Sequence, residues 1–167
     1  MTGRKDQDAK EPVLDPGQPI VDCHHHLWHR DTAYLWNDLL ADTASGHDIR
    51  ATVHVQCHAM LTAAADPDFA QIGETEFVNG VAAMSASGRY GALRACAGIV
   101  GHADLTRGAV VQDVLETHLD RAGARFKGIR HSTAWDADPA LSSTLVQAPP
   151  GLMMDADFRA GIARLAP

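Results

Sequence analysis

Three consecutive histidines, His24, His25 and His26, follow a short apolar segment that begins at Ile20. Alternate side chains of a β-strand share a face, so His24 and His26 are expected to point one way and His25 the other. Neutral imidazole is the commonest metal ligand among side chains. His24 and His26 therefore offer two ligands to one point, and a metal there would need further ligands from elsewhere.

A run of histidines also has a simpler interpretation, as a solvated turn or as a core histidine paired with a backbone group. Its surroundings favour chemistry: an apolar strand leads into it, Asp22 precedes it and Trp28 follows it. Asp22 either orients one of the histidines or caps the strand. Trp28, Tyr34 and Trp36 either line a substrate pocket or belong to the core.

The rest of the sequence alternates between strand and helix patterns. Apolar runs predict strands at residues 20–24, 51–57, 93–100 and 125–131, and periodic apolar stripes predict helices at 72–87, at 109–122 and from about Asp155 onward. A regular strand–helix alternation indicates a parallel sheet. A half barrel and a small open α/β sheet are both consistent with it.

Chemically active residues recur where these strands end. His24 and His26 end the first, His58 and His102 follow the next two, and Arg130 and His131 end the fourth. In parallel α/β barrels the carboxyl ends of strands form the active-site face. His24 and His26 are the strongest candidates and Arg130 and His131 come next, whereas His58 and His102 are weak ones. Arg130 suits a carboxylate-bearing substrate, because a guanidinium grips a carboxylate with two parallel hydrogen bonds; a structural ion pair is the alternative.

The segment Val21–Trp28 resembles the first-strand motif of the amidohydrolase-related family, metal-dependent hydrolases with a TIM-barrel fold. Within that family, the sequence is most similar to the lactonase-like branch. Three later segments, found in the same order as in the family, add to the resemblance: Thr52–Cys57, Ala97–Val100 and Phe126–His131.

The resemblance implies the first half of a (β/α)₈ TIM barrel, with about four parallel strands alternating with helices. A complete barrel typically needs about 250 residues, and this sequence has 167. The implied function is hydrolysis of a lactone or similar cyclic ester or amide of an organic acid. The implied catalytic residues are His24, His26, Arg130 and His131, with His24 and His26 binding Zn²⁺ or Mn²⁺; a metal-free mechanism stays open.

In the family a catalytic aspartate ends the eighth strand and a further histidine comes from the middle strands, and neither segment is in this sequence. We therefore expect this chain alone to be inactive and either to self-associate or to be only partly ordered. The alternatives are a non-catalytic half barrel that binds a metal or small anion, and a decarboxylase of the same superfamily.

Composition limits the partners. The net charge of −7 comes without a basic stripe, so nucleic acid is not expected as a partner, and no apolar run is long enough to predict a membrane span. The expected partner is a small-molecule substrate, anionic because of Arg130. Residues 1–19 are polar and are predicted to form a flexible lead-in to a domain spanning 20–167. They lack the apolar core of a signal peptide, which predicts a cytoplasmic protein. Cys23, Cys57 and Cys96 are expected to be buried free thiols.

Overall fold

A computed structural model describes residues 12–63, 66–141 and 146–165. Its main feature is a parallel sheet of four strands in the order β1-β4-β5-β6, with β1 at Pro19–His25, β4 at Asp48–Val55, β5 at Arg94–Gly101 and β6 at Phe126–Ile129. A two-stranded antiparallel hairpin, β2 (Trp28–His29) and β3 (Ala33–Tyr34), follows β1. The predicted alternation of parallel strands with helices is confirmed. The four-stranded sheet is compatible with a half barrel.

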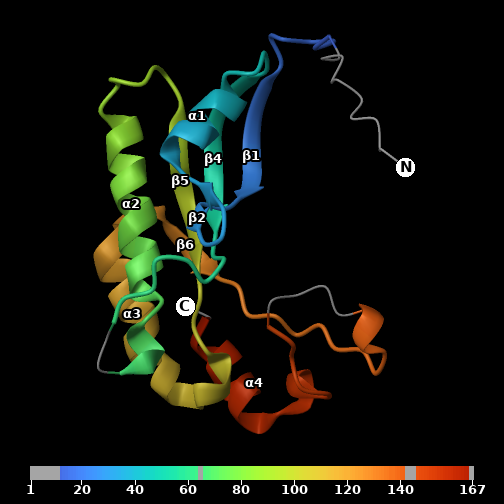
Figure 1. The fold of residues 1–167 in the computed structure, drawn as a ribbon. Coiled ribbons are helices and arrows are strands. Elements are labelled where there is room, and N and C mark those ends of the chain that lie inside the picture. The colour runs from blue at the N-terminus through green and yellow to red at the C-terminus, as the bar shows by residue number, and fades with distance from the viewer. Residues whose placement is uncertain (1–11, 64–65, 142–145, 166–167) are drawn as a thin grey trace.

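Three helices connect the strands: α1 (Trp36–Thr43), α2 (Ile72–Ala86) and α3 (Val111–Ala122). The predicted helices are confirmed to within two residues. A fourth, α4 (Ala156–Ile162), begins at Asp155, whose side chain accepts a hydrogen bond from Phe158 N at 2.8 Å as an N-cap. It lies beyond the carboxyl ends of the strands (Figure 1). No helix in the described part of the chain has the length and apolarity needed to cross a bilayer.

Short 3₁₀ turns complete the fold at Pro67–Phe69, Leu105–Val110, Gly123–Arg125, Pro139–Leu141, Leu152–Met154 and Ala163–Leu165. The fourth strand ends earlier than predicted, so Arg130 and His131 follow β6 instead of belonging to it. One further backbone hydrogen bond extends the pairing of β5 with this segment, from Arg130 N to Gly101 O at 2.9 Å. Most of the expected lead-in, residues 1–11, lies outside the described residues, and β1 already begins at Pro19.

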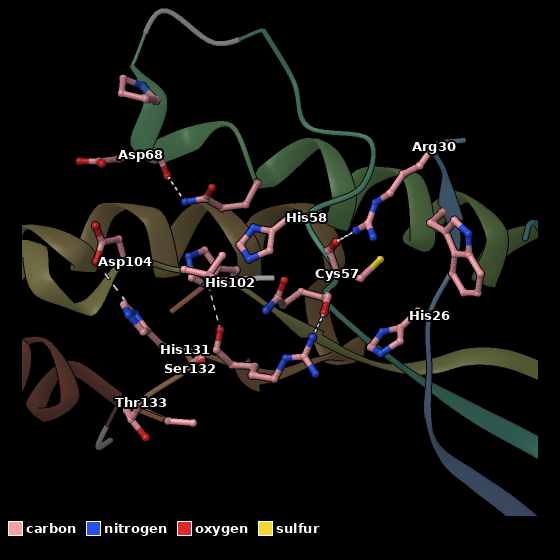
Figure 2. Close-up of a pocket in the computed structure, with 17 residues that line it drawn as sticks. His26, Arg30, Cys57, His58, Asp68, His102, Asp104, His131, Ser132 and Thr133 are labelled. Carbon is pink, nitrogen blue, oxygen red and sulfur yellow. Dashed lines mark hydrogen bonds and ion pairs between the residues drawn. The ribbon is translucent and has the colours of Figure 1, made fainter. Parts of the chain in front are cut away.

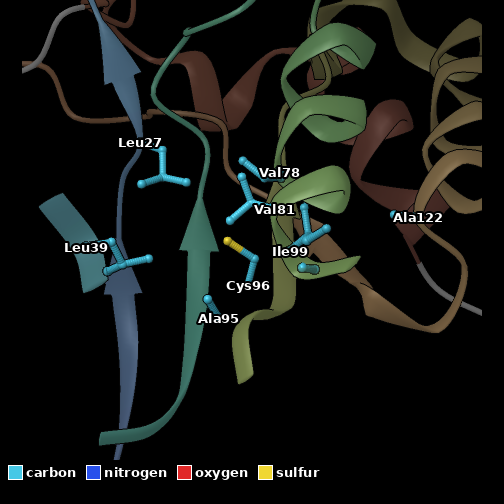
Figure 3. Packing of buried hydrophobic residues seen from close by; sticks show 9 residues of the cluster. Leu27, Leu39, Val78, Val81, Ala95, Cys96, Ile99 and Ala122 are labelled. Atoms are coloured by element: carbon cyan, nitrogen blue, oxygen red, sulfur yellow. The ribbon is translucent and has the colours of Figure 1, made fainter. Parts of the chain in front are cut away.

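One face of the sheet carries the main core. Leu39 of α1, Val78 and Val81 of α2, and Cys96 and Ile99 of β5 pack together there (Figure 3). Cys57 and Cys96 are buried free thiols as predicted, but Cys23 is exposed, because β1 is an edge strand whose register with β4 is irregular between Asp22 and His25.

A second apolar cluster lies at the carboxyl ends of the strands. Phe158 of α4 packs there with residues of the Leu105–Val110 turn and of α3. Gly161 permits this contact, because a Cβ on it would stand 2.3 Å from Leu105 O.

Candidate functional site

A cavity of about 950 Å³ opens at the carboxyl ends of β4, β5 and β6 (Figure 2). Each strand of the parallel sheet contributes to it from the residues just past its end. The residues that carry chemistry are His26, Arg30, His58, His102, Arg130 and His131. Of the candidates named from the sequence, His26, His58, His102, Arg130 and His131 line this cavity, whereas His24 does not.

The three adjacent histidines separate as alternation predicts. His24 is exposed, His25 is buried, and His26 is half-buried at the cavity wall. The rings of His24 and His26 stand edge to face with centroids 4.9 Å apart. His24 does not line the cavity itself but contacts Arg130, whose Nη1 lies 3.5 Å from His24 Nε2. Asp22 caps the strand end: its Oδ1 accepts from His24 N at 3.0 Å.

His26 is fixed by the end of β4. Its Nδ1 lies 2.6 Å from Val55 O, and because a carbonyl only accepts, Nδ1 carries the proton and Nε2 keeps its lone pair. A metal-binding histidine is usually oriented in this way. Burial, the largest cause, lowers the pKa of His26, and the positive charge of Arg130 lowers it further.

Two arginines are anchored on the end of β4. Arg130 Nη2 donates to Gln56 O, and Arg30 Nη2, from the hairpin, donates to Cys57 O. Neither guanidinium forms an ion pair with a carboxylate within the described ranges. Asp68 and Asp104 also line the cavity, but Asp68 binds Arg107 at 2.6 Å and Asp104 caps Thr106 at 3.0 Å.

Three imidazoles form the opposite wall. The rings of His58 and His102 have centroids 4.9 Å apart, and those of His102 and His131 are 5.4 Å apart (Figure 2). His102 Nδ1 lies 2.8 Å from Arg130 O, so it donates and leaves Nε2 unprotonated. His131 Nδ1 accepts from Leu105 N at 3.2 Å. Burial lowers the pKa of both His58 and His102, so these two rings are neutral at pH 7.

A buried carboxylate, Glu74, holds the backbone that carries His58. Glu74, 3% exposed on α2, accepts hydrogen bonds from Cys57 N at 2.8 Å and His58 N at 3.1 Å, and lies 3.3 Å from His54 Nε2. These bonds lower the pKa of Glu74 despite its burial, which acts in the opposite direction. Glu74 is therefore an ionised group that shapes the end of β4.

Some of these residues were not among the predicted candidates. Arg30 lies in a hairpin turn with no periodic pattern to single it out. Glu74 had a detectable signal, because it lies on the helical stripe of Val78, Val81 and Ser85, where a charged residue is out of place. Of the three aromatic candidates, Trp28 lines the cavity, whereas Tyr34 and Trp36 pack against the core.

Of the two imidazoles expected to bind a metal, His24 and His26, only one has its Nε2 free to do so. His26 Nε2 is free to bind a cation, but His24 Nε2 faces the Arg130 guanidinium. Among the described residues, no three His, Cys, Asp or Glu side chains converge as a set of metal ligands. No protein-family model, curated protein or solved structure matches the chain, so the geometry of the cavity carries the functional argument.

Proposed function

We propose that this cavity binds a small organic anion and belongs to a hydrolase of the amidohydrolase-related type that opens a lactone or similar cyclic ester. The observation that carries the proposal is the pair of guanidiniums, Arg30 and Arg130, held on two consecutive carbonyls just past β4 without a carboxylate partner in the described chain. A bound carboxylate would supply the missing negative charge.

The imidazoles support hydrolysis of that anion. Ester hydrolysis requires a group that takes a proton from water and a group that returns one to the leaving oxygen. His58 and His102 are neutral at pH 7 and line the same cavity as the arginines, so they can accept a proton there. His24, His26, Arg130 and His131 remain the residues that the resemblance implies for catalysis.

A divalent metal, Zn²⁺ or Mn²⁺, would be held by His24 and His26 in this proposal. When bound, such a metal polarises the substrate carbonyl. The chain's own contribution is to hold His26 in the tautomer that leaves Nε2 available, through its bond to Val55 O. The remaining ligands would have to come from the substrate, from water or from outside the described residues.

The test compares anionic and neutral lactones on the native protein and on Arg130→Ala. Losing a charge-assisted hydrogen bond costs roughly 1.5–3 kcal/mol, which is about a tenfold or greater loss of kcat/KM. We expect this loss on the anionic lactone and a much smaller one on the neutral lactone. Lys127→Ala is the matched control, because Lys127 is an exposed cation on β6, the strand that leads to Arg130, and lies outside the cavity. Equal losses on both lactones would contradict the proposal.

A non-catalytic anion-binding protein is the second candidate. The contact between Arg130 and His24 favours it, because the positive guanidinium faces His24 Nε2, the atom that would bind a metal. Calorimetric binding of the hydrolysed acid, weakened by Arg130→Ala, with no turnover of any lactone would identify this function.

A further inference from the structure

The backbone of His58 has an unusual conformation. Its φ is 57°, in the left-handed region that residues other than glycine rarely enter. Such a conformation is energetically unfavourable and persists only where its surroundings fix it. Here Glu74 fixes the backbone of His58 by accepting hydrogen bonds from the N–H groups of Cys57 and His58. The following loop is equally constrained, since a Cβ on Gly73 would stand 2.5 Å from Met60 O.

The result of this conformation is an imidazole presented to the cavity. The His58 ring makes no hydrogen bond to any other residue that the structure describes, although it lines the cavity and contacts His102. The His102 ring, whose centroid is 4.9 Å away, donates from Nδ1 to Arg130 O and so keeps an unprotonated Nε2. A strained backbone that holds an imidazole without hydrogen bonds at a cavity wall is typical of a functional residue.

We propose that His58 is the proton-transfer residue of this cavity and that His102 positions it and stabilises its protonated form. This inference rests on the proposed hydrolytic function and names a group that the chain itself supplies for it. In the reaction, water oxygen attacks the ester carbonyl while His58 takes the proton from that water. The tetrahedral intermediate then expels the ester oxygen, which receives the same proton, so that one water and one ester give an acid and an alcohol.

The charges around His58 suit this role. Glu74 behind it favours protonation, whereas Arg130, Arg30 and His131 oppose it, and His102 contacts it directly. Burial is the largest effect, and the pKa of His58 falls below its usual 6.5. The ring is thus neutral at pH 7, and activity that depends on it should rise as pH increases through that lowered value and then level off.

The experiment uses p-nitrophenyl acetate, an activated ester that needs no particular acid group. The variant is His58→Asn, because asparagine tolerates the left-handed backbone and lacks the imidazole. A general base contributes typically 10²–10⁴-fold, so we expect at least a tenfold loss of ester hydrolysis. His47→Gln, an exposed histidine before β4, should leave the rate unchanged. In His102→Asn the pH midpoint should move while part of the rate remains.

Chemical rescue separates a lost base from a damaged fold. His58→Gly also fits the positive φ, and added imidazole should restore its rate in proportion to concentration. An unchanged rate in His58→Asn, an absence of rescue, or a native protein no faster than buffer would overturn the inference. Hydrolysis of anionic lactones that depends on Arg130 but not on His58 would overturn it and leave the proposed function intact. His58-dependent hydrolysis of the nitrophenyl ester without any lactone turnover would support it and contradict the proposed function.

Discussion

The three adjacent histidines at the end of β1 show how far one position along a strand changes the chemistry of a side chain. His24 is exposed beside a guanidinium, His25 is buried, and His26 donates to a backbone carbonyl. The buried His25 ring is held by Thr52. The Thr52 hydroxyl accepts a hydrogen bond from Cys96 N at 3.0 Å and lies 2.9 Å from His25 Nε2. An unprotonated Nε2 can accept from that hydroxyl.

The pKa of His25 predicts acid sensitivity. Burial, followed by the neighbouring His54, lowers this pKa from 6.5 to about 4. The unfolded chain therefore binds a proton near pH 6.5 that the folded chain refuses until about pH 4, so His25 stabilises the fold above pH 6.5 and loses that contribution as pH falls through this window. At 1.36 kcal/mol for each pKa unit, the loss is about 3 kcal/mol.

Urea unfolding at pH 7 and at pH 4.5 measures this effect. His25→Gln should reduce the pH dependence, whereas His47→Gln, which removes an exposed histidine, should not. Part of the dependence should remain in His25→Gln, because burial also lowers the pKa values of His26, His58, His102 and His118. The same slope in His25→Gln and the native protein would contradict the assignment.

Arg130 should also control the affinity for metal. Its guanidinium lies 3.5 Å from His24 Nε2, where it repels a divalent cation. We expect the native protein to bind Zn²⁺ weakly and Arg130→Met to bind it about tenfold more tightly, a modest gain because His24 is exposed and solvent screens the charge. Calorimetric titration measures the change. Arg130→Lys should bind as weakly as the native protein, and a gain that survives His24→Ala would exclude this pair as the site.

At the scale of elements, the junction between β4 and α2 depends on Glu74. Removing its carboxylate leaves the buried N–H groups of Cys57 and His58 without an acceptor, and each such group costs roughly 1–3 kcal/mol. Glu74→Ala should therefore lower the free energy of unfolding by about 3 kcal/mol or more. Chemical denaturation measures it.

Glu76→Ala is the matched control for this change. Glu76 lies on the same helix but is exposed, in a surface ion pair with Arg121 at 3.1 Å. Such pairs contribute between about 0 and 1 kcal/mol. A similar loss in the two variants would mean that Glu74 acts through the helix and not through the strand end.

The elements were largely predictable from sequence, whereas the contacts between them were not. Apolar runs and helical stripes locate β4, β5, α2 and α3, and polar residues after each strand locate the site. Glu74 bonds to residues 16 and 17 positions earlier, and Arg30 reaches a carbonyl 27 positions later. Periodicity contains no information on such pairings, because they depend on how a helix and a hairpin pack on the strand end. The left-handed backbone of His58 follows from the same packing.

At the scale of the whole molecule, the described sheet is covered on one side and open at both edges. α1, α2 and α3 contribute to one core, on one face. β1 and β6 each pair with a single neighbour, so each leaves a row of backbone groups unpaired within the described sheet. Val21 on β1 is 61% exposed, and Lys127 on β6 is exposed too. Backbone groups of this kind invite pairing with another chain.

We therefore expect this chain to self-associate through the β1 edge and its exposed face. Burying apolar surface contributes about 25 cal/mol per Å², so covering a few hundred Å² would offset the several kcal/mol that association costs. Sedimentation velocity over a range of concentrations measures the oligomers.

Val21→Lys should shift the chain toward monomer, because charge on an edge strand discourages pairing. Val110→Lys is the control, since Val110 is 64% exposed but precedes α3, away from β1. If association is weakened equally by the two changes, it uses general apolar contact and not the strand edge. If neither protein associates at any concentration, the open edge is tolerated, as short or irregular edges often are, and the irregular register between Asp22 and His25 would be the feature that protects it.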